Sequence, residues 1–313
     1  MQNQGIKYLR VFLHSECNFH CISCQDSAVK KTPAPQEVLS TEETAKLVDG
    51  FARLGIEHVR IIGGEPLLRD DIFDFIYMIS SAGRVRQVSL TTNGFYLKSK
   101  ALALKGAGLD RVNIYLSSLN EEKFRKITGV DGLGRVMEGI CAANAAELKP
   151  IRVNVFLVKG LNFDETEDFA ALTTLYPLDV RFIEYRCDVK DAYVPGYVVK
   201  NKIEFSFGEL EPQAGSANEG PASYYRIKGA KGRIGFINSI TELFCVNCNT
   251  ILLYNDGRVF PCLYSPACIE LASLLRKNEY KALAEQMRGC FARKPEVNKY
   301  TKAETFETQI SGS

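Results

Sequence analysis

The sequence predicts an α/β protein, a partial (β/α)6 barrel followed by a C-terminal α+β extension. Runs rich in valine, isoleucine, leucine and aromatic residues alternate with helix-like stretches as far as Tyr185. Beyond that residue the alternation is lost among glycines and prolines, and short strand-like runs follow. Strands that alternate with helices predict a parallel sheet with the helices outside. A curved sheet of six such strands is a barrel that stays open on one side.

The expected strands and helices follow one another in chain order. We expect strands near Tyr8–Leu13, His58–Ile62, Gln87–Thr91, Arg111–Leu116, Ile151–Leu157 and Val180–Tyr185. We expect helices near Thr41–Leu54, Asp70–Ser81, Leu97–Lys105, Gly132–Ala145 and Asp164–Leu175. Ser40 and Thr41 followed by Glu43 are typical of a helix start with a capping glutamate. Functional groups of such a barrel are expected at the C-terminal ends of the strands.

Three segments are expected along the chain. Residues 1–186 form the partial barrel, 187–222 a connecting region, and 223–313 a C-terminal domain. The connecting region contains Pro195-Gly196, Gly208 and Pro212, which interrupt any regular pattern. The C-terminal domain is expected to contain short strands and one or two final helices. These strands are placed near Tyr224–Lys228, Arg233–Ile237, Ile251–Tyr254 and Val259–Pro261.

The overall composition is that of an intracellular enzyme. The chain has 313 residues, of which 46% are hydrophobic, so it can bury a large core. Its net charge is 39 − 37 = +2, which gives no electrostatic reason to expect nucleic acid or an anionic membrane as a partner. No apolar run approaches a membrane span, and the first residues contain no apolar signal segment. We therefore expect a cytoplasmic location, where ten cysteines favour metal and redox chemistry over disulfides.

Cys17, Cys21 and Cys24, here called the first cysteine set, form a C-x3-C-x2-C pattern just after the first expected strand. Three thiolates on one loop can bind three irons of a cubane iron–sulfur cluster, which leaves the fourth iron open to a small molecule. The alternatives are a zinc site completed by His14 or His20, a disulfide pair, or three unrelated thiols.

Cys245, Cys248 and Cys262, the second cysteine set, form a C-x2-C-x13-C pattern. The third follows a turn signal at residues 255–258. A zinc ribbon with Cys268 as fourth ligand is the alternative. Two separate sets of three cysteines are better explained by two clusters that each keep one open iron. The remaining cysteines stand alone: Cys141, Cys187, Cys268 and Cys290.

Further motifs follow the expected strands. They are Gly63-Gly64-Glu65-Pro66 after strand two, Thr91–Gly94 after strand three, Phe124–Gly129 after strand four, Val158–Asn162 after strand five, Arg181–Tyr185 on strand six, and Ile234–Glu242 later in the chain. The first cysteine set and the Gly-Gly-Glu-Pro motif resemble the radical S-adenosylmethionine (radical SAM) superfamily. With the second set and the later motifs, residues 5–263 resemble the GTP 3′,8-cyclase family within it.

The resemblance implies a fold, cofactors and a reaction. It implies a barrel of the radical SAM type, whose C-terminal extension holds a second iron–sulfur cluster. The cofactors would be two 4Fe-4S clusters and S-adenosyl-L-methionine. In the family, a 5′-deoxyadenosyl radical takes hydrogen from C3′ of GTP, and C3′ then bonds to C8 of guanine, which opens molybdenum-cofactor biosynthesis. The implied partners are a nucleotide substrate and an electron donor such as flavodoxin or ferredoxin, and a homodimer is left open.

The resemblance also implies residue roles. Both cysteine sets would bind clusters. The cofactor-binding residues would be Gly63, Gly64, Glu65, Asn93 and Tyr115, and the substrate-binding residues Arg10, Arg60, Thr91, Lys159 and Arg181. The residues themselves leave alternatives, since Asn93-Gly94 is equally a plain turn, and each cation could face solvent or join an internal ion pair.

The chain departs from the family pattern mainly at substrate-facing positions. The family has two arginines after the second cysteine of the C-terminal set, where this chain has Thr250 and Leu252. His58 and Tyr115 replace a basic residue and a serine, and the last residues are Ser-Gly-Ser instead of Gly-Gly.

Three hypotheses follow for the function. The chain is a GTP cyclase; it is a radical SAM enzyme for another nucleotide, a natural-product intermediate or a peptide; or it is a non-enzymatic zinc or electron-transfer protein. The intact Gly-Gly-Glu-Pro motif disfavours the last. Substrate, product, electron donor and oligomeric state stay open.

Overall fold

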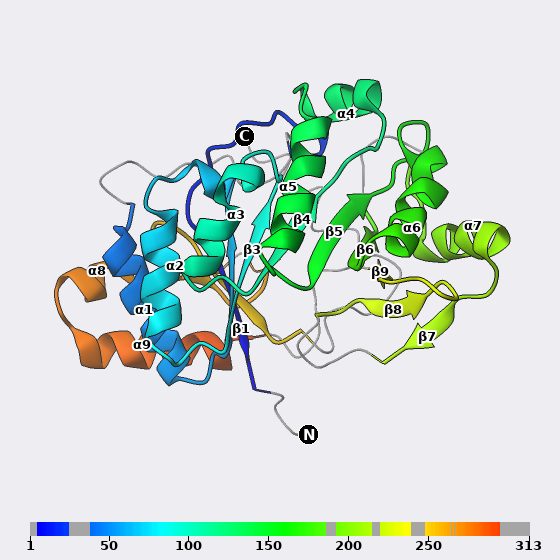
Figure 1. Cartoon of the computed structure of the whole chain (residues 1–313). Helices are drawn as coiled ribbons and strands as arrows, with labels where there is room; N and C mark the ends of the chain where they lie inside the picture. Colours follow the sequence, from blue (N-terminus) through cyan, green and yellow to red (C-terminus); the bar gives the residue numbers. More distant parts are fainter. Residues whose placement is uncertain are drawn as a thin grey trace, which may run out of the picture.

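The computed structural model describes residues 5–24, 38–185, 192–214, 220–238, 248–263, 265 and 267–294. Within these residues the strands form one curved sheet, in the order β12-β11-β10-β1-β2-β3-β4-β5-β6-β9-β8-β7 (Figure 1). The sheet is mixed and does not close into a barrel. None of the helices described is long and apolar enough to cross a membrane.

The six central strands are parallel and lie next to one another in chain order, as predicted. They are β1 (Tyr8–Phe12), β2 (His58–Ile62), β3 (Gln87–Thr92), β4 (Arg111–Tyr115), β5 (Ile151–Phe156) and β6 (Leu178–Ile183). Alternate residues such as Leu9 and Val11 are fully buried on the outer face, beneath the helices. The residues between them, such as Arg10, therefore face the inside of the partial barrel.

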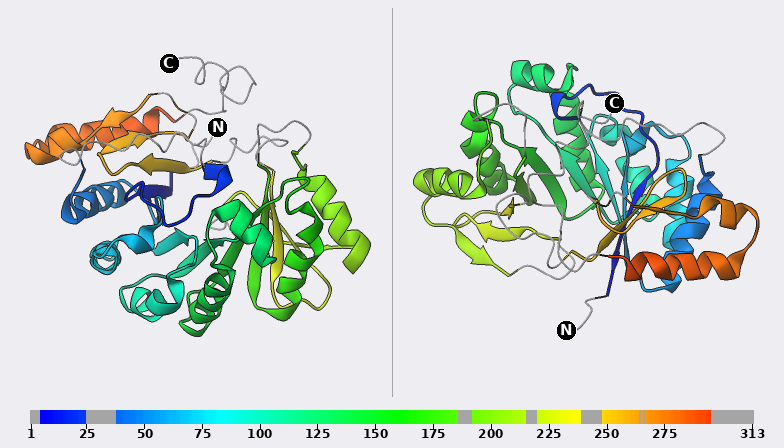
Figure 2. Two further views of the ribbon diagram at one scale, coloured as in Figure 1. Left: turned by 90° about the horizontal axis from the view of Figure 1, so that it is seen from above. Right: turned by 180° about the vertical axis from the view of Figure 1, so that it is seen from behind.

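Helices cover the convex outer face of this sheet (Figure 2). The expected helices are present as α1 (Thr41–Arg53), α2 (Ile72–Ser81), α3 (Leu97–Gly106), α5 (Leu133–Ala145) and α6 (Thr166–Leu175). The capping box at the start of α1 is confirmed, because Ser40 and Glu43 each accept a hydrogen bond from the other's backbone N–H. One helix, α4 (Glu121–Thr128), was not among the expected ones; it begins after the cap residue Asn120 and ends at Gly129, which has φ 75°.

The C-terminal extension adds strands to both edges of the central sheet. On one edge β9 (Arg233–Ile237) pairs parallel to β6, followed by β8 (Ser223–Arg226) and β7 (Glu211–Gln213). On the other edge β10 (Thr250–Leu253) pairs parallel to β1, followed by β11 (Arg258–Phe260) and β12 (Ile269–Glu270). With α8 (Ala272–Arg276) and α9 (Tyr280–Ala292), these strands form the predicted α+β extension.

The region 187–222, expected only as a connection, contains α7 (Gly196–Phe207) and β7. Of the residues that suggested a break, Pro195-Gly196 and Gly208 lie at the ends of this helix, and Pro212 lies in β7. Pro195 is its N-cap and Gly208, with φ 82°, its C-cap. The proposed domain boundaries at 186 and 222 stay a prediction, since a single sheet joins strands from both sides of them.

Candidate active site

The first cysteine set lies on the loop after β1, at the C-terminal end of the parallel strands. Cys17 and Cys24 are exposed and Cys21 is half-buried. A hydrogen bond between the thiols of Cys21 and Cys24, followed by burial, raises the pKa of Cys21. Burial also raises the pKa of Cys17. Three thiols that crowd together in this way are costly to ionise on their own, so the loop suits a strongly cationic group that neutralises all three.

The segment at the end of α4 packs against the loop of the first cysteine set. The backbone N–H of His20 donates to the Thr128 carbonyl at 2.8 Å, and the rings of Phe19 and Phe124 meet edge to face at 5.8 Å. Gly129 leaves room for His20, because a Cβ there would lie 3.2 Å from the His20 Cβ. The motif at residues 124–129 therefore supports the cysteine loop.

Gly63 and Gly64 bring the loop after β2 against the loop after β1. The N–H of Gly64 donates to the His14 carbonyl and that of Glu65 to the Glu16 carbonyl, each at 2.7 Å. A Cβ on Gly64 would overlap the Glu16 carbonyl, and one on Gly63 would lie 2.6 Å from the His14 oxygen. Glycine is therefore needed for the two loops to meet, whatever else the motif binds.

Glu65 joins this rim to the end of β3. Its carboxylate is fully buried and accepts hydrogen bonds from the Leu67 N–H at 2.9 Å, the Thr92 hydroxyl at 2.7 Å and the Asn93 N–H at 2.7 Å. Burial raises the pKa of this carboxyl group. Asn93, held in place by Glu65, donates from its amide to Cys17 Sγ at 3.8 Å and to Asn18 at 2.8 Å. Four of the five predicted cofactor-binding residues, Gly63, Gly64, Glu65 and Asn93, thus lie at the loop of the first cysteine set.

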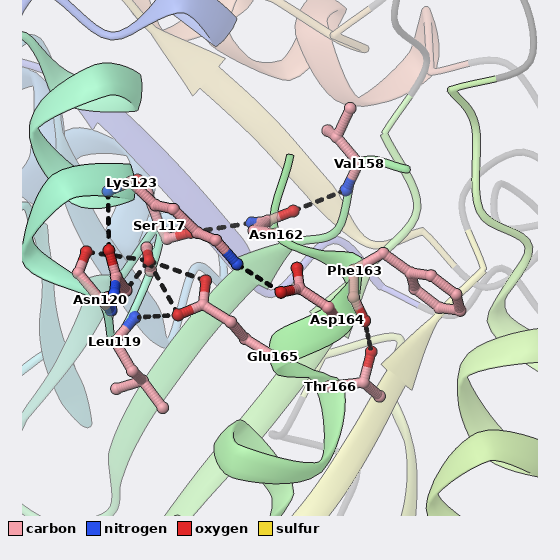
Figure 3. A network of polar contacts seen from close by, with 11 residues as sticks. Ser117, Leu119, Asn120, Lys123, Val158, Asn162, Phe163, Asp164, Glu165 and Thr166 are labelled. Atoms are coloured by element: carbon pink, nitrogen blue, oxygen red, sulfur yellow. Dashed lines mark hydrogen bonds and ion pairs between the residues drawn. The ribbon is translucent and has the colours of Figure 1, made fainter. Parts of the chain in front are cut away.

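The strand-five motif connects the loops after β4 and β5 (Figure 3). The Asn162 amide donates to the carbonyls of Ser117 and Phe156 at 2.8 Å, and its oxygen accepts from the Val158 N–H at 2.8 Å. The buried Glu165 accepts from the Ser118 hydroxyl and the Leu119 N–H. These bonds fix the rim from which Lys159 projects with an exposed side chain.

Inside the barrel, cations stand side by side on neighbouring strands. The pairing register aligns Leu252, Arg10, Arg60, Ser89 and Arg111 across five adjacent strands. We call Arg10, Arg60 and Arg111 the arginine row. Burial, followed by the charges of Arg10, Arg181 and Arg111, lowers the pKa of Arg60 well below its ordinary value.

The arginine row lacks carboxylate partners among the described residues. Arg111, 1% exposed, bonds to the Tyr8 hydroxyl, while its Nε and Nη2 and the Nε of Arg60 have no partner there. Arg181, 3% exposed, donates from Nε and Nη2 to the Asn154 side chain at 2.9 and 2.8 Å. A buried cation without an anion is unfavourable, so this part of the lumen suits an anionic ligand.

Two other lumen arginines, Arg233 and Arg152, share the single carboxylate of Asp179. Arg233 binds Asp179 through two bonds of 3.0 and 2.7 Å and lies over the Tyr224 ring. The Nε of Arg152 lies 3.9 Å from the same carboxylate. For Arg10, Arg60 and Arg181 no ion pair with a carboxylate is found among the described residues, whereas Lys159 has the exposed side chain that the sequence left as an alternative.

The described residues of the second cysteine set lie at the opposite end of β1. Cys248 precedes β10, whose first residue pairs with Tyr8, and the Asn249 carbonyl accepts from the N–H groups of Lys7 and Tyr8 at 3.1 Å. Cys262 follows β11, the antiparallel neighbour of β10, and is buried. Cys245 lies outside the described residues. The arginine row thus lies between the first set and Cys248 with Cys262, which are separated from that set by at least the length of β1, roughly 15 Å.

Tyr115 and Thr91 also face the lumen. Tyr115 is 39% exposed at the end of β4, where its ring stacks on Phe156 at 5.3 Å, and Thr91 is half-buried. His58 is buried and stacks on Tyr8 at 4.6 Å. Lys159 lies beyond the C-terminal end of β5, at the rim, and so does not belong to the arginine row inside the barrel.

Arg111 and Asn154 were missed as lumen residues by the sequence reasoning. The signal was present in the strands themselves, because Arg111-Val112-Asn113-Ile114 and Arg152-Val153-Asn154-Val155 alternate polar with apolar residues. In a strand whose apolar face lies under helices, the polar residues must face the lumen.

Comparisons with known proteins agree with this geometry. Residues 11–173 match the Radical SAM superfamily, and residues 178–300 match the family described as Molybdenum Cofactor Synthesis C. Among solved structures, Streptococcus suis SuiB bound to S-adenosylmethionine is similar with a TM-score of 0.65 and 12% identity, over 91% of this chain and 68% of that one. Native anSMEcpe with bound AdoMet gives a TM-score of 0.60 and 13% identity, over 90% and 82%. At these identities the two structures show the shared fold.

Sequence relatives are more specific. A GTP 3′,8-cyclase of Thermodesulfovibrio yellowstonii is 39% identical over 292 residues, which cover 91% of this chain and 89% of the relative. A GTP 3′,8-cyclase of Heliobacterium modesticaldum is 41% identical over 280 residues, which cover 88% and 86%. The fold, the cysteine loop and the family matches define a radical SAM enzyme. Within that superfamily, the chain belongs to the GTP 3′,8-cyclase family.

The residues present fit the cofactors of this family, which are S-adenosylmethionine and two 4Fe-4S clusters. Within the described part of the chain, no three His, Cys, Asp or Glu side chains are placed to hold a single metal ion. A cubane cluster makes a different demand, since each thiolate binds a separate iron. The crowded thiols of the first set, beside the cradle of Gly63 and Gly64, meet that demand.

Proposed function

We propose that the substrate is GTP and that it binds inside the barrel between the two cysteine sets. The observation that supports this most is the arginine row, with three cations on one level of the lumen and no carboxylate beside them in the described residues. Guanidinium groups suit phosphates because they are planar and donate several hydrogen bonds at once. The names of the relatives point to the same ligand.

In this proposal the triphosphate is bound by Arg10, Arg60 and Arg111, with Arg181 beside them. Arg111 offers Nε and Nη2, and Arg60 offers Nε, as donors without partners in the described residues. The Asn154 oxygen orients the Arg181 guanidinium. Burial, followed by repulsion from Arg10, Arg181 and Arg111, lowers the pKa of Arg60, and a bound anion would offset both effects. Lys159 at the rim and Thr91 on β3 are proposed as further substrate contacts.

The first cysteine set is proposed to hold the cluster that works with S-adenosylmethionine, and Cys245, Cys248 and Cys262 the second cluster. When bound, these groups supply one-electron cleavage of the cofactor and removal of a hydrogen atom from the substrate. The contribution of this chain is placement: Gly63 and Gly64 bring the two rim loops together, and Glu65 fixes Asn93 beside Cys17. Oε2 of Glu65 accepts one hydrogen bond within the described residues, from the Asn93 N–H, so it retains an acceptor position for the predicted contact with the cofactor's amino group.

A second candidate is the same chemistry on another nucleotide, a natural-product intermediate or a peptide. Leu252 favours this second candidate. It is a buried apolar residue that pairs with Arg10 at the end of the arginine row, at a position where the family has a basic residue. An electron donor such as flavodoxin or ferredoxin, a homodimer and a cytoplasmic location also stay predictions.

Calorimetry on the anaerobically reconstituted enzyme tests the substrate. GTP is expected to bind, and GMP to bind at least tenfold more weakly because it lacks two of the three phosphates proposed to contact the arginine row. The dissociation constant for ATP, which has the same phosphates but a different base, shows how much the guanine base contributes to binding. If GTP does not bind at millimolar concentration, and a variant with Thr250→Arg and Leu252→Arg gains no binding, the second candidate replaces the first.

A further inference from the structure

Lys294 is placed by the last helix at the second cysteine set. It follows α9, which is anchored on α1 by the rings of Phe51 and Phe291, 6.1 Å apart. The Lys294 side chain is half-buried, and its Nζ donates to Cys248 Sγ at 3.5 Å, to the Thr250 carbonyl at 2.6 Å and to the Pro261 carbonyl at 3.1 Å.

These three bonds use the full donor capacity of an ammonium group, which has three N–H bonds. The acceptors come from both segments that contain the described cysteines of the second set. Thr250 is two residues after Cys248, and Pro261 directly precedes Cys262. In the described part of the chain no carboxylate forms an ion pair with Lys294, so its charge acts on the sulfur and the two carbonyls.

We propose that Lys294 is a positioning residue of the second cluster site, which joins the two cysteine segments and raises the reduction potential of the cluster held there. The inference rests on the proposed assignment of Cys248 and Cys262 as cluster ligands. A positive charge that donates to a ligand sulfur stabilises the more negative, reduced form of a cluster, and hydrogen bonds to the sulfurs are among the factors that set such potentials.

The test is a redox titration of the reconstituted holoenzyme, followed by electron paramagnetic resonance. A protein in which the first cysteine set is replaced by alanine identifies the signal of the second cluster. Lys294→Gln keeps a hydrogen-bond donor without the charge, and Lys294→Arg keeps both. Lys281→Gln is the matched control, because Lys281 is exposed in the first turn of α9, about 20 Å along the helix from Lys294.

The expected result is a roughly tenfold lower ratio of reduced to oxidised second cluster in Lys294→Gln at the wild-type midpoint, a downward shift of about 59 mV for one electron. Lys294→Arg and Lys281→Gln should titrate like the wild type. Equal potentials in Lys294→Gln and the wild type would overturn the inference, as would equal shifts in the Gln and Arg variants.

Iron content distinguishes the remaining outcomes. A wild-type protein that binds only about four irons would overturn the second-cluster assignment, and this inference with it. Loss of the second cluster from Lys294→Gln and Lys294→Met, with retention in Lys294→Arg, would support a need for the charge. Loss of that cluster from all three variants would show that the site tolerates only the native shape, and would overturn the charge effect.

Discussion

Replacing Arg60 with methionine should have opposite effects on substrate binding and on the stability of the free protein. Arg60 stands between Arg10 and Ser89 in the pairing register, and its Nε has no partner among the described residues. Its charge is therefore useful only when an anion occupies the lumen. Methionine fills similar space without the charge.

The magnitude follows from the surroundings of the side chain. Loss of one charge-assisted bond to a phosphate costs about 1.5–3 kcal/mol, so the dissociation constant for GTP should rise roughly ten- to a hundredfold. In the free protein, removal of a half-buried cation whose Nε is buried beside like charges should raise the free energy of unfolding by about 1–3 kcal/mol.

Arg233→Met is the matched control in the same lumen. Arg233 is paired with Asp179 through two bonds, so its loss leaves the buried carboxylate with only Arg152 at 3.9 Å and should lower the free energy of unfolding by about 3 kcal/mol. Chemical denaturation of the apoproteins measures both stabilities, and calorimetry on the reconstituted proteins measures GTP binding. If Arg60→Met destabilises the protein as Arg233→Met does, or weakens GTP binding less than threefold, the arginine row is structural and the reasoning fails.

Three further predictions concern the cysteine sets, the rim and the missing arginines. Alanine at the first cysteine set should halve the iron of the reconstituted protein and abolish 5′-deoxyadenosine formation, whereas alanine at the second set should halve the iron and leave some cleavage; zinc at the second set would contradict this. Arg69 and Asp71 form an ion pair between β2 and α2, and the hydrogen bond from Arg69 lowers the pKa of the Asp71 carboxyl group. The stabilisation that this ion pair gives the folded protein is therefore present above the ordinary pKa of about 4, and it is lost as the pH falls through the lowered value. Asp71→Asn should therefore lower the unfolding free energy of the apoprotein by about 1 kcal/mol at pH 7 and much less at pH 2, and an equal loss at both would refute the ion pair. Thr250→Arg with Leu252→Arg should tighten GTP binding about tenfold or more and destabilise the free protein, because Leu252 is buried; unchanged stability would place these side chains outside the lumen.

The central strands and most outer helices were predictable because they depend on local patterns. The runs rich in β-branched residues at residues 58–62 and 87–92 match β2 and β3 closely, and Ser40 with Glu43 marks the start of α1. The ends of α7 were misread, because Pro195-Gly196 and Gly208 bound a helix as readily as they interrupt one. Proline and glycine alone do not show whether they end a helix or interrupt regular structure altogether.

The site was only partly predictable because half of its geometry is long-range. The spacing of the first cysteine set showed the loop, but the pairing of β10 with β1 joins residues about 240 positions apart and has no local signal. That pairing puts Cys248 at the far end of the lumen and Leu252 beside Arg10. The contacts of Lys294 depend on the packing of α9 on α1, which the sequence does not specify locally.

The most direct test of the proposed function is the transfer of hydrogen from GTP. The enzyme, reconstituted anaerobically and reduced with dithionite, is given S-adenosylmethionine and GTP with deuterium at C3′, and the products are analysed by mass spectrometry. The proposal predicts 5′-deoxyadenosine that contains deuterium and a new product with the mass of unlabelled GTP, because one electron from the reductant and one proton from water replace the deuterium atom lost from C3′. 5′-Deoxyadenosine without deuterium, formed at the same rate with and without GTP, would contradict the proposal.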